Sequence, residues 1–230
     1  MPKKLLLFDI DGTLILTGGV AVGLMTESIS EVAGLPIRWS MVDFIGNTDQ
    51  NIIQILLHRN GIGESDVPEM SSIILQKYLK HLKVELAKDG VIQILPGVLK
   101  LLQSVKADTR FSLGLLTGNM LAAAQIKLSQ KQLFDYFPIG AFGDDALKRE
   151  QLPPFAIQRA EKYYGQFFVR KDIWLIGDSV NDIRCAQHNH LKCLAVASGH
   201  TPKEELASYR PTALVDDLQD TAAILNILNT

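Results

Sequence analysis

Short apolar runs recur along the chain and are separated by stretches with helical periodicity. The runs do not alternate apolar and polar positions, which is typical of parallel strands buried on both faces. They read KLLLFDI (4–10), FSLGLLT (111–117), DIWLIGD (172–178), LKCLAVA (191–197) and TALVDD (212–217). Helices are predicted between and after them, over 97–106, 119–131, 154–164, 180–188, 203–209 and 218–228. This alternation of strand and helix predicts an open parallel α/β sheet.

The region 17–90 breaks this alternation, because it contains no convincing strand and three helical patterns instead. The patterns cover 20–33, 48–60 and 68–88. In the last two, apolar side chains recur on one face: Ile52, Ile53, Leu56 and Leu57, then Met70, Ile74, Leu82 and Leu86. We therefore predict two domains, an α/β core formed by 1–16 and 91–230 and a helical domain formed by 17–90. The glycine pair Gly18-Gly19 at one end and Asp89-Gly90 at the other are candidate hinges.

The overall composition excludes several classes of protein. The chain has 230 residues, 47% of them hydrophobic, and a formal net charge of −2, so neither nucleic acid nor an anionic membrane is an expected partner. The start MPKKLLLF resembles a signal peptide, but Asp9 and Asp11 end its apolar run after four residues. No stretch of about 18 apolar residues predicts a membrane span. Cys185 and Cys193 are interpreted as reduced core thiols, and we expect a cytoplasmic protein.

Two carboxylates interrupt the apolar run LLLFDIDGTLIL at 5–16. Burying an unpaired carboxylate costs several kcal/mol, which is roughly the whole free energy of unfolding of a marginally stable domain. Asp9 and Asp11 therefore either lie at a solvated strand end or meet a cation. A calcium loop of the EF-hand type does not fit, because its twelfth position is Val20 and the flanking sequence resembles a strand.

Polar residues also follow two other predicted strands. Thr117 ends the strand at 111–117 and is followed by Gly118 and Asn119, and Asp178 ends the strand at 172–178. Parallel strands bring their carboxyl ends to one edge, so these groups are expected to meet Asp9 and Asp11 there. A divalent cation would relieve the repulsion between the acids, and an all-oxygen set favours Mg²⁺ over zinc. Taken alone, Thr-Gly-Asn could merely cap the next helix, and so could Ser179.

Three motifs together resemble the haloacid dehalogenase-like superfamily, in particular its phosphoglycolate-phosphatase-like hydrolases. DIDGTL (9–14) is similar to the first motif of the family, LLTGN (115–119) to the second, and GDSVNDIRCA (177–186) to the fourth. The resemblance covers nearly the whole chain. It implies a Rossmann-like core, with 17–90 as an α-helical cap inserted after the first strand.

The resemblance also implies a role for each motif residue. Asp9 would be the nucleophile that forms an aspartyl-phosphate, and Asp11 the acid and base. Mg²⁺ would be held by the Asp9 carboxylate, the Asp11 carbonyl and Asp178, with Asp182 orienting a metal-bound water. Thr117, Gly118 and Asn119 would hold the phosphate through a hydroxyl, an amide and backbone N–H groups. Because dehalogenases of the superfamily lack an acid at the position of Asp11, phosphoryl chemistry is favoured.

The third motif departs from the family pattern. The family has a lysine before the helix that precedes the fourth motif, whereas aligning DDALKREQLPPFAIQRA (144–160) places Gln151 there. Arg149 or Lys148 must then supply the positive charge. We favour Arg149, because a guanidinium can bridge phosphate and carboxylate. The alternative is that both are solvated surface charges.

The function predicted is therefore a Mg²⁺-dependent phosphatase acting on a small phosphorylated metabolite, of the phosphoglycolate, sugar phosphate or nucleotide type. The alternatives are a phosphomutase or phosphotransferase of the β-phosphoglucomutase type and a non-catalytic phosphate-binding regulatory protein. The cap is expected to select the substrate, although Thr48 and Asp49 in its loop FIGNTDQ (44–50) are interpreted as N-caps of the next helix. A monomer or homodimer is expected.

Overall fold

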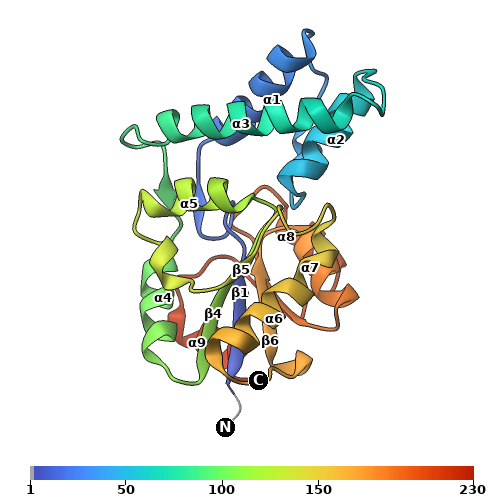
Figure 1. The fold of residues 1–230 in the computed structure, drawn as a ribbon. Coiled ribbons are helices and arrows are strands. Elements are labelled where there is room, and N and C mark those ends of the chain that lie inside the picture. The colour runs from blue at the N-terminus through green and yellow to red at the C-terminus, as the bar shows by residue number, and fades with distance from the viewer. Residues whose placement is uncertain (1–2) are drawn as a thin grey trace.

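The core of the molecule is a six-stranded parallel sheet, as seen in a computed structural model that describes residues 3–230 (Figure 1). The strand order is β5-β4-β1-β6-β7-β8, and every neighbouring pair is parallel. The strands are β1 (Lys4–Phe8), β4 (Phe111–Leu116), β5 (Gly140–Ala141), β6 (Ile173–Gly177), β7 (Lys192–Val196) and β8 (Ala213–Val215). The five predicted strands are present. Of the six strands of this sheet, only β5 was not predicted, because two small residues carry no strand pattern.

Helices cover both faces of the sheet, which confirms the predicted α/β architecture. Alternate side chains of β1 point to opposite faces: Leu6 and Phe8 belong to one buried cluster, Leu5 and Leu7 to the other. The first cluster includes α4 (Val98–Ala107), α5 (Leu121–Ser129) and α9 (Thr221–Leu228). The second includes α6 (Pro153–Tyr164), α7 (Val180–His188) and α8 (Lys203–Ser208). The central strand β1 is thus buried from both sides, as its unbroken apolar run requires.

Some helix ends differ from the sequence prediction. Helix α9 begins at Thr221, not 218, because the Asp220 carboxylate caps it by accepting a hydrogen bond from the Ala223 N–H (3.0 Å). The described residues also form short 3₁₀ turns that are absent from the prediction: η1 (Met41–Asp43), η2 (Phe134–Tyr136), η3 (Arg149–Gln151) and η4 (Arg170–Asp172). Within residues 3–230, none of the helices combines the length and apolar character needed to cross a membrane.

The helices of the inserted region lie together beyond one end of the sheet (Figure 1). They are α1 (Val20–Ala33), α2 (Asp49–Arg59) and α3 (Val67–Glu85), and α3 packs against the other two. The chain passes to and from them through an antiparallel pair, β2 (Ile15–Leu16) with β3 (Gln93–Ile94). Two-residue strands were not predictable from the pattern. The boundaries 17 and 90 of a cap domain stay a prediction.

Candidate active site

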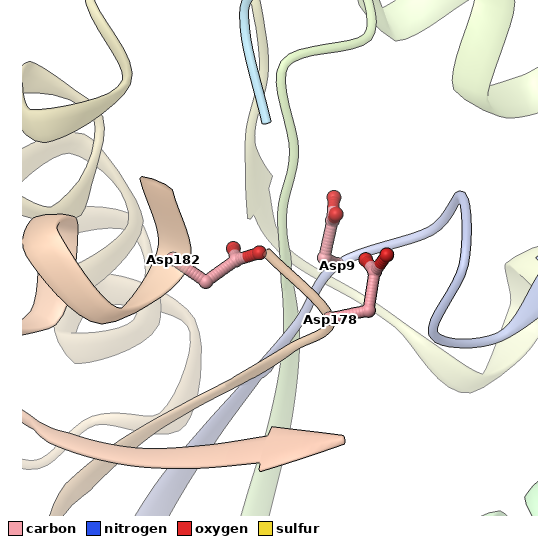
Figure 2. Close-up of side chains that lie close together, drawn as sticks. All are labelled: Asp9, Asp178 and Asp182. Carbon is pink, nitrogen blue, oxygen red and sulfur yellow. The ribbon is translucent and has the colours of Figure 1, made fainter. Parts of the chain in front are cut away.

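Two of the predicted acids stand at neighbouring strand ends. Asp9 directly follows β1, and its N–H donates to the Ile176 carbonyl (2.9 Å); Asp178 directly follows β6. Both side chains are buried, and so is Asp182 in the first turn of α7. One carboxylate oxygen of each of the three lies within 4.8 Å of the others, and Figure 2 shows Asp9 and Asp178 side by side with Asp182 opposite. The structure therefore brings these three predicted residues together.

A tight turn after Asp9 directs Asp11 into the space above the strand ends. Gly12 has φ of 80°, and a Cβ atom there would lie 2.3 Å from Oδ2 of Asp178. Only glycine fits this left-handed conformation and this approach. The Asp11 side chain is 40% exposed, in contrast to the buried Asp9, and it lines a cavity between the sheet and the helical region. The two acids of the first motif thus differ sharply in environment.

Arg149 is the cation inside the acidic cluster. Its Nη2 lies 2.6 Å from Oδ1 of Asp182 and 3.0 Å from Oδ1 of Asp9, and its side chain is only 5% exposed. Its Nε is buried and has no hydrogen-bond partner within residues 3–230. Lys148 is exposed, as is Gln151. Of the two cations considered from the sequence, the structure places Arg149 at the acids; its role towards phosphate stays a prediction.

The charges of this cluster do not balance. Asp9, Asp178 and Asp182 contribute three negative charges and Arg149 one positive charge, which leaves two negative charges in a buried space. Burial raises the pKa of Asp9 to about 6 against the opposing effect of Arg149, and burial raises the pKa of Asp178 well above its ordinary value. A divalent cation held by oxygen atoms would remove this imbalance, so the residues present fit Mg²⁺.

Asp182 is held by protein donors at both oxygens. Oδ1 accepts from Arg149, while Oδ2 accepts from the Ser179 N–H (3.1 Å) and hydroxyl (2.6 Å). The Ser179 hydroxyl in turn accepts from the Asp182 N–H, so the pair forms a capping box at the start of α7. The alternative interpretation of Ser179 as a helix cap is therefore correct, and the cap fixes Asp182 beside Arg149.

The second motif follows β4 and faces Asp11. Thr117 is fully buried, and Thr117, Gly118 and Asn119 all line the cavity. The side-chain amide of Asn119 donates to Oδ2 of Asp11 (2.8 Å) and to the Thr117 hydroxyl (2.9 Å). Both amide N–H groups are thereby used, so in this structure the Asn119 side chain orients Asp11. Its contact with phosphate stays a prediction.

Lys127 is a site residue that the sequence pattern did not lead us to predict. Its Nζ lies 2.6 Å from Oδ2 of Asp11 and 2.6 Å from Oδ1 of Asn119, and its side chain is only 4% exposed. A detectable signal existed, because Lys127 shares one face of α5 with the buried Ala123 and Ala124, at spacings of four and three. A lysine on the buried face of a helix needs a buried partner.

The acids and the second motif form the floor of one cavity of about 240 Å³, between the sheet and the helical region. The core contributes Asp9, Asp11, Gly12, Ile15, Leu16, Thr117, Gly118, Asn119, Lys127, Arg149, Asp178 and His200 to its wall. The region 17–90 contributes Thr17, Gly18, Gly19, Ala21, Val22, Met25, Met41, Phe44, Ile45, Gly46, Asn47, Asp49, Ile52 and Tyr78. The helical region therefore supplies a largely apolar upper wall.

Residues 6–196 match the family model described as "Haloacid dehalogenase-like hydrolase". The chain belongs to this family. The match covers most of the sequence, including the first, second and fourth motifs, and it confirms the resemblance on which the site residues were chosen.

Known relatives and a solved structure agree with membership in the haloacid dehalogenase-like hydrolases. The chain is 23% identical to phosphoglycolate phosphatase 1 of Pseudomonas aeruginosa (94% of this chain, 78% of the relative). It is 25% identical to phosphoglycolate phosphatase of Nitrosospira multiformis (98% and 96%). The structure of β-phosphoglucomutase from Clostridium difficile superposes with a TM-score of 0.75 at 17% identity (100% and 98%), which shows the fold. Together, family and relatives support a phosphatase.

Asp49 occupies a different position in this hydrolase from the one expected. Thr48 alone caps α2, its hydroxyl accepting from the Asn51 N–H (3.1 Å). Asp49 instead contacts the second-motif loop: its N–H donates to the Gly118 carbonyl (2.8 Å), and its Oδ2 accepts from the Met120 N–H (2.9 Å). The interpretation of Asp49 as a helix cap is therefore wrong. The sequence could not reveal this, because it depends on where α2 packs against the core.

Burial raises the pKa of Asp49 to about 6, against the opposing effect of Lys127. A folded-state pKa above the unfolded one means that protonated Asp49 stabilises the fold below about pH 4, and that this stability is lost as pH rises through about 6. Asp49→Asn mimics the protonated form. Its free energy of unfolding relative to the natural protein should therefore rise between pH 4 and pH 7, by on the order of 2 kcal/mol. Urea unfolding at several pH values, with the exposed Asp216→Asn as control, measures this. A constant difference would contradict it.

Proposed function

We propose that the protein is a Mg²⁺-dependent phosphatase that hydrolyses a small phosphomonoester through an aspartyl-phosphate on Asp9. The observation that carries the proposal is the buried carboxylate cluster at the ends of β1 and β6, which has two uncompensated negative charges and a single guanidinium. Such a cluster fits a divalent cation and, with it, a phosphate group. Asp9 supplies the carboxylate nucleophile, and Asp11, two residues later, supplies the acid and base.

Asp9, Asp178 and the backbone carbonyl of Asp11 are the groups proposed to hold Mg²⁺. Asp182, which Arg149 and Ser179 hold in place, would orient a water at the metal and would not bind it directly. When bound, Mg²⁺ neutralises charge on Asp9 and the phosphate, so that an anionic nucleophile can approach an anionic ester. Arg149 adds a fixed positive charge beside Asp9.

In the first step an Asp9 oxygen attacks phosphorus while the bond from phosphorus to the ester oxygen breaks. Protonated Asp11 gives its proton to the departing alkoxide, which leaves as an alcohol. Lys127 and Asn119 both donate to Oδ2 of Asp11, which leaves Oδ1 free of these two hydrogen bonds for this transfer. The product of the step is the phosphoryl ester of Asp9 and an Asp11 carboxylate.

In the second step the Asp11 carboxylate takes a proton from water, and the water oxygen attacks phosphorus. The bond between phosphorus and Asp9 breaks, which restores the Asp9 carboxylate and releases inorganic phosphate. Asp11 ends the cycle protonated, as it began. Its half-exposed position suits this double role, because both the leaving alcohol and the water must reach it.

Release of p-nitrophenol from p-nitrophenyl phosphate, with Mg²⁺ and with a chelator in its place, tests the proposal. We expect turnover that requires Mg²⁺ and that returns when the metal is restored. Incubation with a sugar phosphate separates hydrolysis from transfer: free phosphate supports the phosphatase, whereas an isomer without free phosphate indicates a mutase. No turnover of either substrate with Mg²⁺ would indicate a phosphate-binding protein instead.

Removing the Lys127 ammonium should slow the reaction without unfolding the protein. Lys127→Met keeps the length of the side chain but removes its two hydrogen bonds to Asp11 and Asn119. Because Asp11 is then poorly oriented, we expect kcat to fall on the order of 10²-fold with a smaller change in KM. Lys162→Met, on the exposed side of α6, is the matched control. Equal kcat values for the two variants would rule out the role of Lys127.

A further inference from the structure

The charges of the cavity wall carry information on the substrate. Two groups of residues line the cavity. One surrounds the proposed position of the phosphate group, and the other surrounds the space for the leaving alcohol. The second group consists of Asp49 and Tyr78 from the helical region, with Asp11 and Lys127 below them. Any inference from this second group rests on the proposed function, because it concerns the alcohol part of the ester.

The helical region contributes no cation to this space. Among its residues within the described chain that line the cavity, Asp49 is the only charged one, and the others include Val22, Met25, Phe44 and Ile52. The one nearby ammonium, Lys127, already bonds with Asp11 and Asn119. Asp49 itself forms no ion pair within residues 3–230, so its carboxylate faces the space for the alcohol without a direct counter-charge. An anionic leaving group would meet repulsion there, in surroundings that screen charge poorly.

The same space offers hydrogen-bond acceptors. Asp49 is buried, and Met120 occupies only its Oδ2, so that Oδ1 has no partner within residues 3–230. The Tyr78 ring is buried, with 2% of its surface exposed, and its hydroxyl likewise has no hydrogen-bond partner among the described residues. Asp49, Tyr78 and Asp11 all line the same cavity. Because Asp49 and Tyr78 both line the cavity, their oxygens without a partner within residues 3–230 can accept from a donor on the ligand.

We propose that the substrate is a phosphomonoester whose alcohol has an apolar body and a hydrogen-bond donor, hydroxyl or ammonium, and carries no second anionic group. Asp49 is its specificity-determining residue, through Oδ1. Phosphoglycolate, the substrate in the names of two relatives, carries a carboxylate at this position and is disfavoured. The region 17–90 thus supplies selection by charge, and the core supplies the chemistry.

Three esters with the same two-carbon body test the proposal: phosphoglycolate, 2-hydroxyethyl phosphate and O-phosphoethanolamine. Their dissociation constants are measured with Mg²⁺ in Asp9→Asn, where no turnover is expected, and their kcat/KM values in the natural protein. We expect both donor-bearing esters to bind and react at least about tenfold better than phosphoglycolate. Phosphoglycolate binding equal to or tighter than the other two would overturn the proposal.

The source of the preference is tested by Asp49→Asn, which keeps the size of the side chain and removes its charge. The preference of O-phosphoethanolamine over phosphoglycolate should shrink about tenfold, whereas Asp216→Asn, at an exposed acid, should leave it unchanged. An unchanged ratio in Asp49→Asn would contradict the assignment of Asp49. Because binding is measured apart from turnover, the expected ranking without any hydrolysis by the natural protein would refute the phosphatase and leave the substrate class standing.

Discussion

Asp9→Asn should abolish phosphatase activity while leaving the protein folded. An amide oxygen is a poor nucleophile for phosphorus, so we expect kcat/KM to fall by at least about 10⁴-fold. The fold should not suffer, because burial raises the pKa of Asp9 to about 6 and the ionised carboxylate therefore destabilises the metal-free native state. Release of p-nitrophenol and the thermal midpoint without Mg²⁺ give the two readouts.

The control for this variant is Asp216→Asn, which makes the same chemical change at an exposed acid. Asp216 directly follows β8, which lies at the other end of the strand order from β4. It should keep its activity. A natural level of activity in Asp9→Asn would exclude Asp9 as the nucleophile. A large fall in the midpoint of Asp9→Asn would instead show that the charge account of the cluster is wrong.

Arg149→Ala should be the second most damaging change. It removes the guanidinium that lies between Asp9 and Asp182 and leaves both acids without this cation. Breaking a buried pair in this way destabilises a protein by about 3–5 kcal/mol. Loss of one fixed charge at the reacting phosphate adds a fall in kcat of roughly 10²- to 10³-fold. Denaturant unfolding and steady-state kinetics measure the two effects.

Two further variants keep this prediction testable if Arg149→Ala does not fold. Arg149→Lys retains the charge without the planar fork, so it should fold and lose roughly tenfold in kcat. Lys148→Ala, at an exposed neighbour of Arg149, should change stability by less than about 0.5 kcal/mol and leave kcat nearly unaltered. A larger loss of activity in Lys148→Ala than in Arg149→Lys would assign the third motif to Lys148.

The sheet and the position of the acids were predictable because both depend on local pattern. Unbroken apolar runs mark strands buried on two faces, and a carboxylate at the end of such a run marks the catalytic edge of the sheet. Asp9 and Asp178 follow this rule. Strand β5 and the pair β2 with β3 escaped it, since two residues are too few to show a period and pair only through contacts made by the rest of the fold.

The side chains that complete the site depend on packing between distant segments. Asp49 lies at the start of a helix, where the local sequence favours a capping role. Because α2 packs against the core, however, its carboxylate accepts from the Met120 N–H instead. The position of Lys127 on the buried face of its helix could be detected from the sequence. That its partners are Asp11 and Asn119 could not. Arg149 was chosen against Lys148 by its chemistry, and its burial beside Asp182 depends on the turn η3.

The central claim is that Asp9 carries the phosphoryl group between two chemical steps. Asp11→Asn reacted with p-nitrophenyl phosphate tests it most directly, because p-nitrophenol leaves with little need for a proton while the second step lacks its base. We predict a burst of p-nitrophenol equal to the number of active sites, and mass spectrometry after acid quenching should find one phosphoryl group on the peptide that contains Asp9. A phosphoryl group on any other residue, or a burst without a labelled Asp9, would contradict the account.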